Sequence, residues 1–208
     1  MLQEYKDGGS TMWFLLACAI MGLALAIERA FTLTVRLRLN VKKFSQQLLN
    51  TIDKNGVKAG IELCDKTTSP AARVLSAALE HVDQGKTAME DAVVRSGANE
   101  LAFLDRGMAL ISGLCTVAPF FGFLGTVTGM ISAFKAVAAV GEVEATVVAS
   151  GIAEALITTK WGLIIAAPLS VVYILYQGRT NGYLRDMETA SSELMDFLIA
   201  KGIIKKED

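Results

Sequence analysis

The chain has 208 residues, 52% of them hydrophobic, yet it carries 20 basic and 21 acidic side chains. Charged and apolar residues must therefore be separated along the sequence, which is typical of a membrane protein with sizeable aqueous parts. The formal net charge of −1 and the lack of a basic stripe with interleaved aromatic residues argue against nucleic acid as the main partner. Three widely spaced cysteines, Cys18, Cys64 and Cys115, indicate neither a disulfide framework nor a zinc site.

The first apolar segment, residues 11–35, predicts a transmembrane helix because about 20 apolar residues suffice to cross the hydrocarbon layer. Residues 1–10 before it are more acidic than basic and no small-residue cleavage pattern follows, so we do not expect a signal peptide. Adjacent charges near its far end, Glu28 and Arg29, are expected to form an interfacial anchor in which both side chains snorkel towards water.

Residues 36–106 are predicted to form a helical aqueous region, because good helix formers dominate. Ser69-Pro70 predicts a helix start and Asn55-Gly56 a break. Nothing strong interrupts the helical pattern from Lys86 into the next apolar segment, which predicts one unbroken helix there.

Two further spans are predicted, at residues 107–134 and 147–177, joined by a loop at residues 135–146. Helical pattern continues from the third span into residues 178–208. The expected fold class is thus an all-α integral membrane protein with three transmembrane helices, two of them long and extending into the cytoplasm.

The expected orientation follows from lysine and arginine, which are enriched on cytoplasmic flanks. Residues 36–106 hold eleven of the twenty, and residues 178–208 hold five. The leader and the loop after Phe134 hold one each. This distribution predicts a periplasmic N-terminus and a cytoplasmic C-terminus.

Small residues recur along one side of the second and third spans, and such stripes let membrane helices approach closely. Two interpretations stay open: packing within one chain, or a narrow lumen between chains. Thr126 and Thr128 on one helix and Thr158 and Thr159 on the other would supply hydroxyls to a lumen. The stripes consist of Ala118, Gly122, Gly125, Gly129 and Ala133 in the second span, and Gly151, Ala155, Gly162 and Ala166 in the third.

Two charges lie inside the third span, Glu154 and Lys160. An ionised carboxylate in hydrocarbon is costly, so Glu154 is either an ion-path residue or an interfacial glutamate paired with a neighbour. Lys160 lies about 240° further round the helix and needs another partner, such as Glu28 or a carboxylate on a second protein.

Catalytic or metal-binding constellations are not found in the sequence, so we expect neither an enzyme nor a cofactor. Pro119 and Pro168 each free a backbone carbonyl within a span and allow a kink. The lone His81 is expected to be an exposed surface residue.

Two long motifs resemble those of the MotA/TolQ/ExbB proton-channel family. Residues 118–131, APFFGFLGTVTGMI, resemble the "AP-x-x-GLLGTV-x-GMI" segment, and residues 151–168, beginning GIAEALITT, resemble "GIAEAL-x-x-T-x-x-GL-x-x-A-x-P". The Glu28-Arg29 pair fits the "ER" at the end of the family's first span.

The resemblance, closest to ExbB and TolQ, implies a pentamer of this chain that encloses two copies of a single-span partner similar to ExbD or TolR. That partner carries a titratable aspartate, and ion flow rotates one component within the other to drive a TonB-like or TolA-like protein. The implied location is the bacterial inner membrane. Thr126 and Thr159 match the family's pore-facing threonines, Glu154 its third-span glutamate, and Pro119 and Pro168 its prolines.

Lys160 and Trp161 depart from the small or apolar residues usual in the family, and we expect Lys160 to face away from the lumen. The pair Thr158-Thr159 also resembles some sodium-driven relatives, which leaves the coupling ion open. Alternative functions are a motility stator, made less favourable by three spans, and a passive membrane scaffold.

Overall fold

The computed structural model describes residues 9–36, 39–140 and 145–204. Within these residues every regular element is a helix. Three stretches are long and apolar enough to cross a membrane. The predicted fold class, an all-α membrane protein with three spanning helices, is therefore confirmed.

The chain divides into two compact units. We call residues 1–29 and 107–175 the apolar unit, and residues 30–106 and 176–208 the charged unit.

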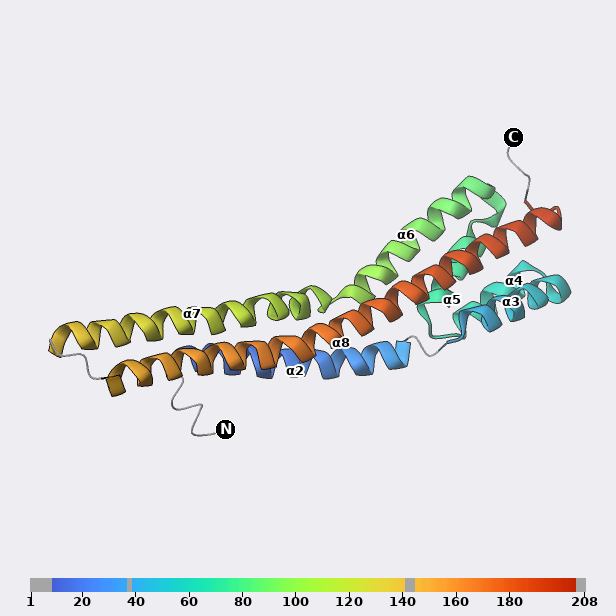
Figure 1. Ribbon diagram of the computed structural model, residues 1–208. Helices are drawn as coiled ribbons and strands as arrows, with labels where there is room; N and C mark the ends of the chain where they lie inside the picture. The colour runs from blue at the N-terminus through green and yellow to red at the C-terminus, as the bar shows by residue number, and fades with distance from the viewer. Residues whose placement is uncertain (1–8, 37–38, 141–144, 205–208) are drawn as a thin grey trace. The chain divides into compact units, whose positions relative to one another are not determined.

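The apolar unit contains α2 (Thr11–Arg36) up to residue 29, α7 (Met108–Val140), and α8 (Ala145–Ala200) up to residue 175. These three helices lie side by side (Figure 1). Large apolar side chains also cover the outside, since Trp13, Phe120 and Ile174 are 66%, 66% and 65% exposed. Such a surface suits lipid or a neighbouring apolar helix rather than water. The buried core consists of Met12, Leu15, Cys18, Leu114, Ala118, Ala166 and Leu169.

The helix predicted to run unbroken from Lys86 is divided in the structure. Helix α6 (Lys86–Asp105) ends before Arg106, and α7 starts after Gly107, whose φ is +86°. Glycine adopts this left-handed conformation without a Cβ clash, so the sequence signal for the break was Gly107 itself.

The other predicted long helix is confirmed, because α8 runs for 56 residues and passes through Pro168. Helix also occupies most of the stretch predicted as a loop at residues 135–146, since α7 continues to Val140 and α8 begins at Ala145. Residues 141–144 lie outside the described residues.

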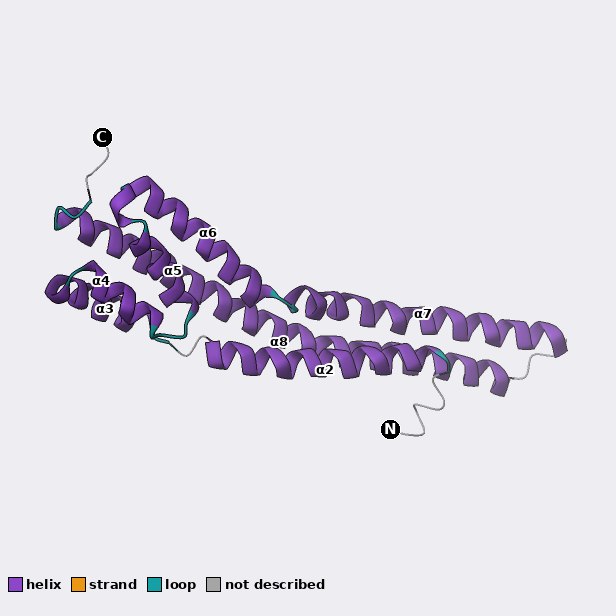
Figure 2. Ribbon diagram, turned by 180° about the vertical axis from the view of Figure 1, so that it is seen from behind, coloured by secondary structure: helices purple, strands orange, loops and turns teal. Residues whose placement is uncertain are grey.

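The charged unit is built from α3 (Val41–Asn55), α4 (Val57–Asp65), α5 (Pro70–Glu80), the short 3₁₀ helix η1 (Val82–Gln84), α6, and the end of α8 (Figure 2). Helix α3 buries Phe44, Leu48 and Ile52, which recur every four residues on one face. These side chains pack in one core with Leu75, Leu79, Leu194 and Leu198.

The predicted helix break and helix start in this unit are confirmed. Gly56, with φ +83°, separates α3 from α4, and α5 begins at Pro70 directly after Ser69. The expectation for His81 was wrong. Its ring is only half-exposed, and Nδ1 lies 2.9 Å from the carbonyl oxygen of Ala77.

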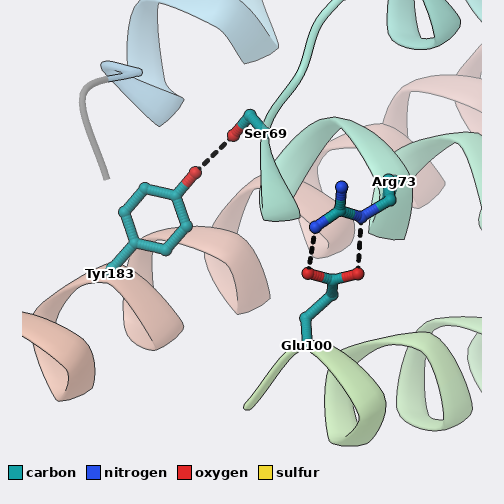
Figure 3. A network of polar contacts seen from close by, with 4 residues as sticks. All are labelled: Ser69, Arg73, Glu100 and Tyr183. Atoms are coloured by element: carbon teal, nitrogen blue, oxygen red, sulfur yellow. Dashed lines mark hydrogen bonds and ion pairs between the residues drawn. The ribbon is translucent and has the colours of Figure 1, made fainter. Parts of the chain in front are cut away.

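Polar contacts join α5 to α6 and α8 (Figure 3). The buried hydroxyls of Ser69 and Tyr183 are 2.6 Å apart. Arg73 donates two hydrogen bonds to the Glu100 carboxylate, which raises the pKa of the guanidinium. Burial raises the pKa of Tyr183, while hydrogen bonds from Ser69 and Ala71 oppose that shift.

Candidate functional site

The candidate site is the contact between α7 and α8 inside the apolar unit, where the two small-residue stripes meet. A Cβ atom added at Gly122 would lie 2.9 Å from the carbonyl oxygen of Thr158, and one at Gly162 would lie 2.9 Å from that of Ala118. Both distances are shorter than real contacts allow, so the two backbones touch at a place where only glycine fits.

The close contact continues along both helices towards Val140. A Cβ at Gly125 would collide with the side chain of Thr158, and one at Gly129 would lie 3.3 Å from the Cβ of Ala155. Within the described residues the stripes therefore pack against each other in one chain, which is the first of the two interpretations that the sequence left open.

The two neighbouring threonines of α8 bond to the same atom. The Thr158 hydroxyl is 3.1 Å from the carbonyl oxygen of Gly122, and the Thr159 hydroxyl is also 3.1 Å from it. Thr158 is 1% exposed and has a second contact of 2.7 Å to the carbonyl oxygen of Ala155, whereas Thr159 is only partly buried. Of the two threonines, Thr159 is thus the less deeply buried.

The threonines of α7 bond within their own helix. Thr126 donates to the carbonyl oxygen of Phe123 at 2.6 Å, and Thr128 is 3.0 Å from that of Leu124. A hydroxyl that donates in this way keeps its oxygen lone pairs, so it can still accept a hydrogen bond from a protonated carboxyl group.

Glu154 lies beside Gly9, two residues before the start of α2. It is half-buried, and its Oε1 atom is so close to Gly9 that a Cβ there would collide with it. Gly9 has φ +67° and its carbonyl accepts from the Met12 amide at 3.3 Å. A carboxylate is favoured beside the positive end of a helix. Sequence reasoning missed Gly9, although the Gly8-Gly9 dipeptide before an apolar run was a usable turn signal.

The expectation that Glu28 and Arg29 both snorkel was wrong for Arg29. The Arg29 side chain is 7% exposed, while that of Glu28 is 50% exposed and pairs with it at 2.6 Å. Arg29 packs against Gly107, where a Cβ would lie 3.7 Å from the guanidinium Nε. Among the described residues Nη1 of Arg29 has no hydrogen-bond partner.

The prolines do not break their helices. Pro119 lies inside α7 and Pro168 inside α8. Pro119 follows Ala118, whose carbonyl oxygen approaches Gly162. The turn of α7 that Pro119 could kink is therefore part of the close contact between α7 and α8.

Three apolar helices, with two of them joined through glycine and threonine contacts, define an all-helical membrane protein. The chain belongs to the MotA/TolQ/ExbB proton channel family, because the sequence model of that family matches residues 66–189. That region includes the whole of α7 and the part of α8 that contacts it. The family is one of channel and transport subunits rather than of enzymes.

Relatives named for biopolymer transport are similar to most of the chain. An ExbB-like protein of Synechocystis is 31% identical over 206 residues, covering 97% of this chain and 76% of the relative. An ExbB homolog of Methanothermobacter thermautotrophicus is 27% identical over 187 residues, covering 90% and 66%. The biopolymer transport protein exbB1 of Vibrio cholerae is 31% identical over 170 residues, covering 80% and 74%. The matches therefore span between 66% and 76% of these relatives' own lengths.

Proposed function

We propose that this chain is the channel-forming stator subunit of an ion-driven motor similar to ExbB and TolQ. It assembles as a pentamer in the bacterial inner membrane, with its N-terminus periplasmic and its C-terminus cytoplasmic. Two helices of a single-span partner similar to ExbD or TolR occupy the lumen. The work is passed to a TonB-like or TolA-like protein for energy-dependent transport or envelope maintenance.

The observation that carries the proposal is the partly buried Thr159 hydroxyl at the α7–α8 contact. Thr126 belongs to the same pore-facing set in the family motif, one turn along α7 from Gly122. A threonine hydroxyl can donate to an ionised aspartate and can accept from a protonated one. Thr159 and Thr126 therefore suit both protonation states of a partner's carboxyl group as it passes.

The roles of the remaining site residues follow from their positions. The half-buried Glu154 attracts the cation near the start of α2, and Thr158 holds α8 against α7 through Gly122. Gly122, Gly125, Gly129 and Gly162 keep the two backbones close. Ion movement down the gradient supplies about 2.3 kcal/mol per charge per 100 mV.

The test is ion flux into proteoliposomes that contain this chain co-expressed with its single-span partner, under an imposed proton or sodium gradient. Thr159→Val keeps the side-chain shape but removes the hydroxyl, so we expect flux to fall about tenfold or more, the effect of roughly 1.4 kcal/mol on the barrier. Glu154→Ala is expected to lower flux as well.

Thr116→Val is the matched control, because Thr116 is exposed on α7 and donates to the carbonyl of Ser112 in its own helix. It should leave flux unchanged. Flux that does not depend on the partner, and that is unchanged in both Thr159→Val and Glu154→Ala, would instead support a passive scaffold. We propose the proton as the coupling ion, so flux is expected under a proton gradient. Flux under a sodium gradient alone would assign sodium as the coupling ion and contradict proton coupling.

A further inference from the structure

A cavity of about 630 Å³ lies within the charged unit. This volume is within the range of ligand sites, which is about 300–1,000 Å³. The cavity is formed by the end of α2, the start of α3 and the middle of α8. Its polar lining consists of Thr34, Asn40, Lys42, Arg179, Tyr183 and Asp186.

The lining carries an excess of positive charge. Lys42 and Arg179 contribute two cations against the single carboxylate of Asp186. Lys42 and Asp186 are 3.9 Å apart, and their side chains are 75% and 43% exposed, so this pair is weak. Among the described residues no salt bridge is formed by Arg179, whose side chain is exposed. The cavity therefore favours an anion.

The same cavity also has an apolar wall. Leu33 and Val41 are each 2% exposed in the protein core, and Leu39 packs against that core. An inorganic anion gains nothing from such a wall, whereas a molecule with a charged head and a hydrocarbon portion uses both sides.

The lining residues lie close to the expected ends of two spans. Thr34 is the penultimate residue of the first expected span, and Arg179 follows the end of the third expected span by two residues. At about 1.5 Å per helical residue, Arg179 is within one helical turn of that end. This is the depth at which lipid phosphate groups lie, and anionic lipids attract Lys and Arg at the cytoplasmic leaflet.

We propose that this cavity binds the phosphate headgroup of an anionic phospholipid. The phosphate contacts Lys42 and Arg179, and the glycerol and first acyl carbons lie along Leu33, Leu39 and Val41. The site is separate from the α7–α8 contact and does not depend on the proposed ion flux.

The test measures lipid binding to the full chain in neutral detergent by native mass spectrometry. We expect dioleoylphosphatidylglycerol to bind with a dissociation constant about 25-fold lower than dioleoylphosphatidylcholine, since each of the two cations contributes roughly fivefold near a charged lipid. The double variant Lys42→Gln, Arg179→Gln should abolish this preference.

The matched control is the double variant Lys43→Gln, Arg185→Gln, which removes the same charge from the same two helices at exposed positions that do not line the cavity. It should keep the preference. Gly182→Leu is a second test, because Gly182 lines the cavity and a Cβ there would meet only Arg185 Nη2, at 3.9 Å. A leucine at this position adds volume to the wall of the cavity and leaves Lys42 and Arg179 in place, so it should lower lipid binding as strongly as the first double variant.

Three outcomes would overturn the proposal. Equal losses in the two double variants would show general charge attraction rather than a site. Unchanged lipid binding in Gly182→Leu would place the lipid elsewhere. Displacement of the lipid by inorganic phosphate at an equal concentration would assign the cavity to free phosphate.

Discussion

Thr158 and Thr159 are neighbours on α8, but their hydroxyl groups have different surroundings. Both bond to the carbonyl oxygen of Gly122, yet Thr158 is 1% exposed and Thr159 is only partly buried. A buried hydroxyl needs its partner because an unpaired one costs about 1–3 kcal/mol. Replacing Thr158 therefore acts first on packing, whereas the hydroxyl of Thr159 belongs to a residue that is less deeply buried.

Tyr183 offers a test of the charged unit at the same scale. Tyr183→Phe removes the hydroxyl bonded to Ser69, which is 1% exposed, and should lower the free energy of unfolding by about 1–3 kcal/mol. Chemical denaturation in detergent, followed by circular dichroism, measures this change.

Tyr173→Phe on the same helix is the control, because Tyr173 belongs to the apolar unit. This variant should leave the denaturation midpoint of the charged unit unchanged. Adding Ser69→Ala to Tyr183→Phe removes the second unpaired group and should recover part of the loss. An unchanged transition in Tyr183→Phe alone would show that the buried pair contributes nothing net.

Helices α7 and α8 differ from ordinary packed helices in how closely their backbones approach. Carbonyl oxygens of one helix lie against glycine positions of the other, so there is no side chain that can move aside. The contact is therefore sensitive to a single added methyl group, although glycine is normally a weak residue within a helix.

Two glycines of α7 give opposite predictions for substitution by alanine. Gly113→Ala should stabilise the helix by up to about 1 kcal/mol, because a Cβ there meets nothing within 4 Å. Gly122→Ala should destabilise the protein by about 1–3 kcal/mol, because its Cβ would overlap the Thr158 carbonyl and approach the Thr159 Cα at 3.1 Å. Thermal unfolding in detergent should give a higher midpoint temperature than the wild type for Gly113→Ala and a lower one for Gly122→Ala. If Gly122→Ala is as stable as Gly113→Ala, the close contact between α7 and α8 is absent in solution.

At the scale of the whole molecule, the chain combines an apolar unit and a charged unit with separate cores. Cys64 belongs to the core of the charged unit and is 2% exposed. Burial, assisted by the neighbouring Asp65 carboxylate, raises the pKa of its thiol from 9.0 to about 12. This thiol is therefore a reporter of the folding of the charged unit.

Alkylation of Cys64 should be slow until that unit opens. In a Cys18→Ser, Cys115→Ser background at pH 8, a pKa of about 12 in place of 9.0 lowers the thiolate fraction roughly a thousandfold. The shift also predicts the effect of pH on stability. Below pH 9.0 both states keep the proton, and between 9.0 and about 12 only the unfolded chain loses it, so stability falls as pH rises through that window.

Ser192→Cys with Cys64→Ser in the same background is the control, because position 192 is exposed on α8 within the charged unit. It should react at once with iodoacetamide, as followed by mass spectrometry. Equal rates for the two cysteines at pH 8 would show that Cys64 is accessible in the folded protein.

Much of the architecture was predictable because it depends on local properties of the chain. Hydropathy over about 20 residues identifies a span wherever it occurs, and helix punctuation at Asn55-Gly56 and Ser69-Pro70 acts within a few residues. The two motifs that indicated the family are also contiguous, at residues 118–131 and 151–168. Gly107 was a missed local signal, since a glycine alone inside a helical pattern is often tolerated.

The sequence by itself thus determined the three apolar helices, the family and the residues that share each helical face, because a period of 3.6 residues sets those faces without any partner. Only the tertiary structure decided which face meets which neighbour. It brought Gly122 against both threonines, Gly9 against Glu154, and Arg29 beneath Gly107 rather than towards water. These contacts join residues that are far apart in the chain, so they depend on how the packed helices fit together rather than on any short stretch of sequence.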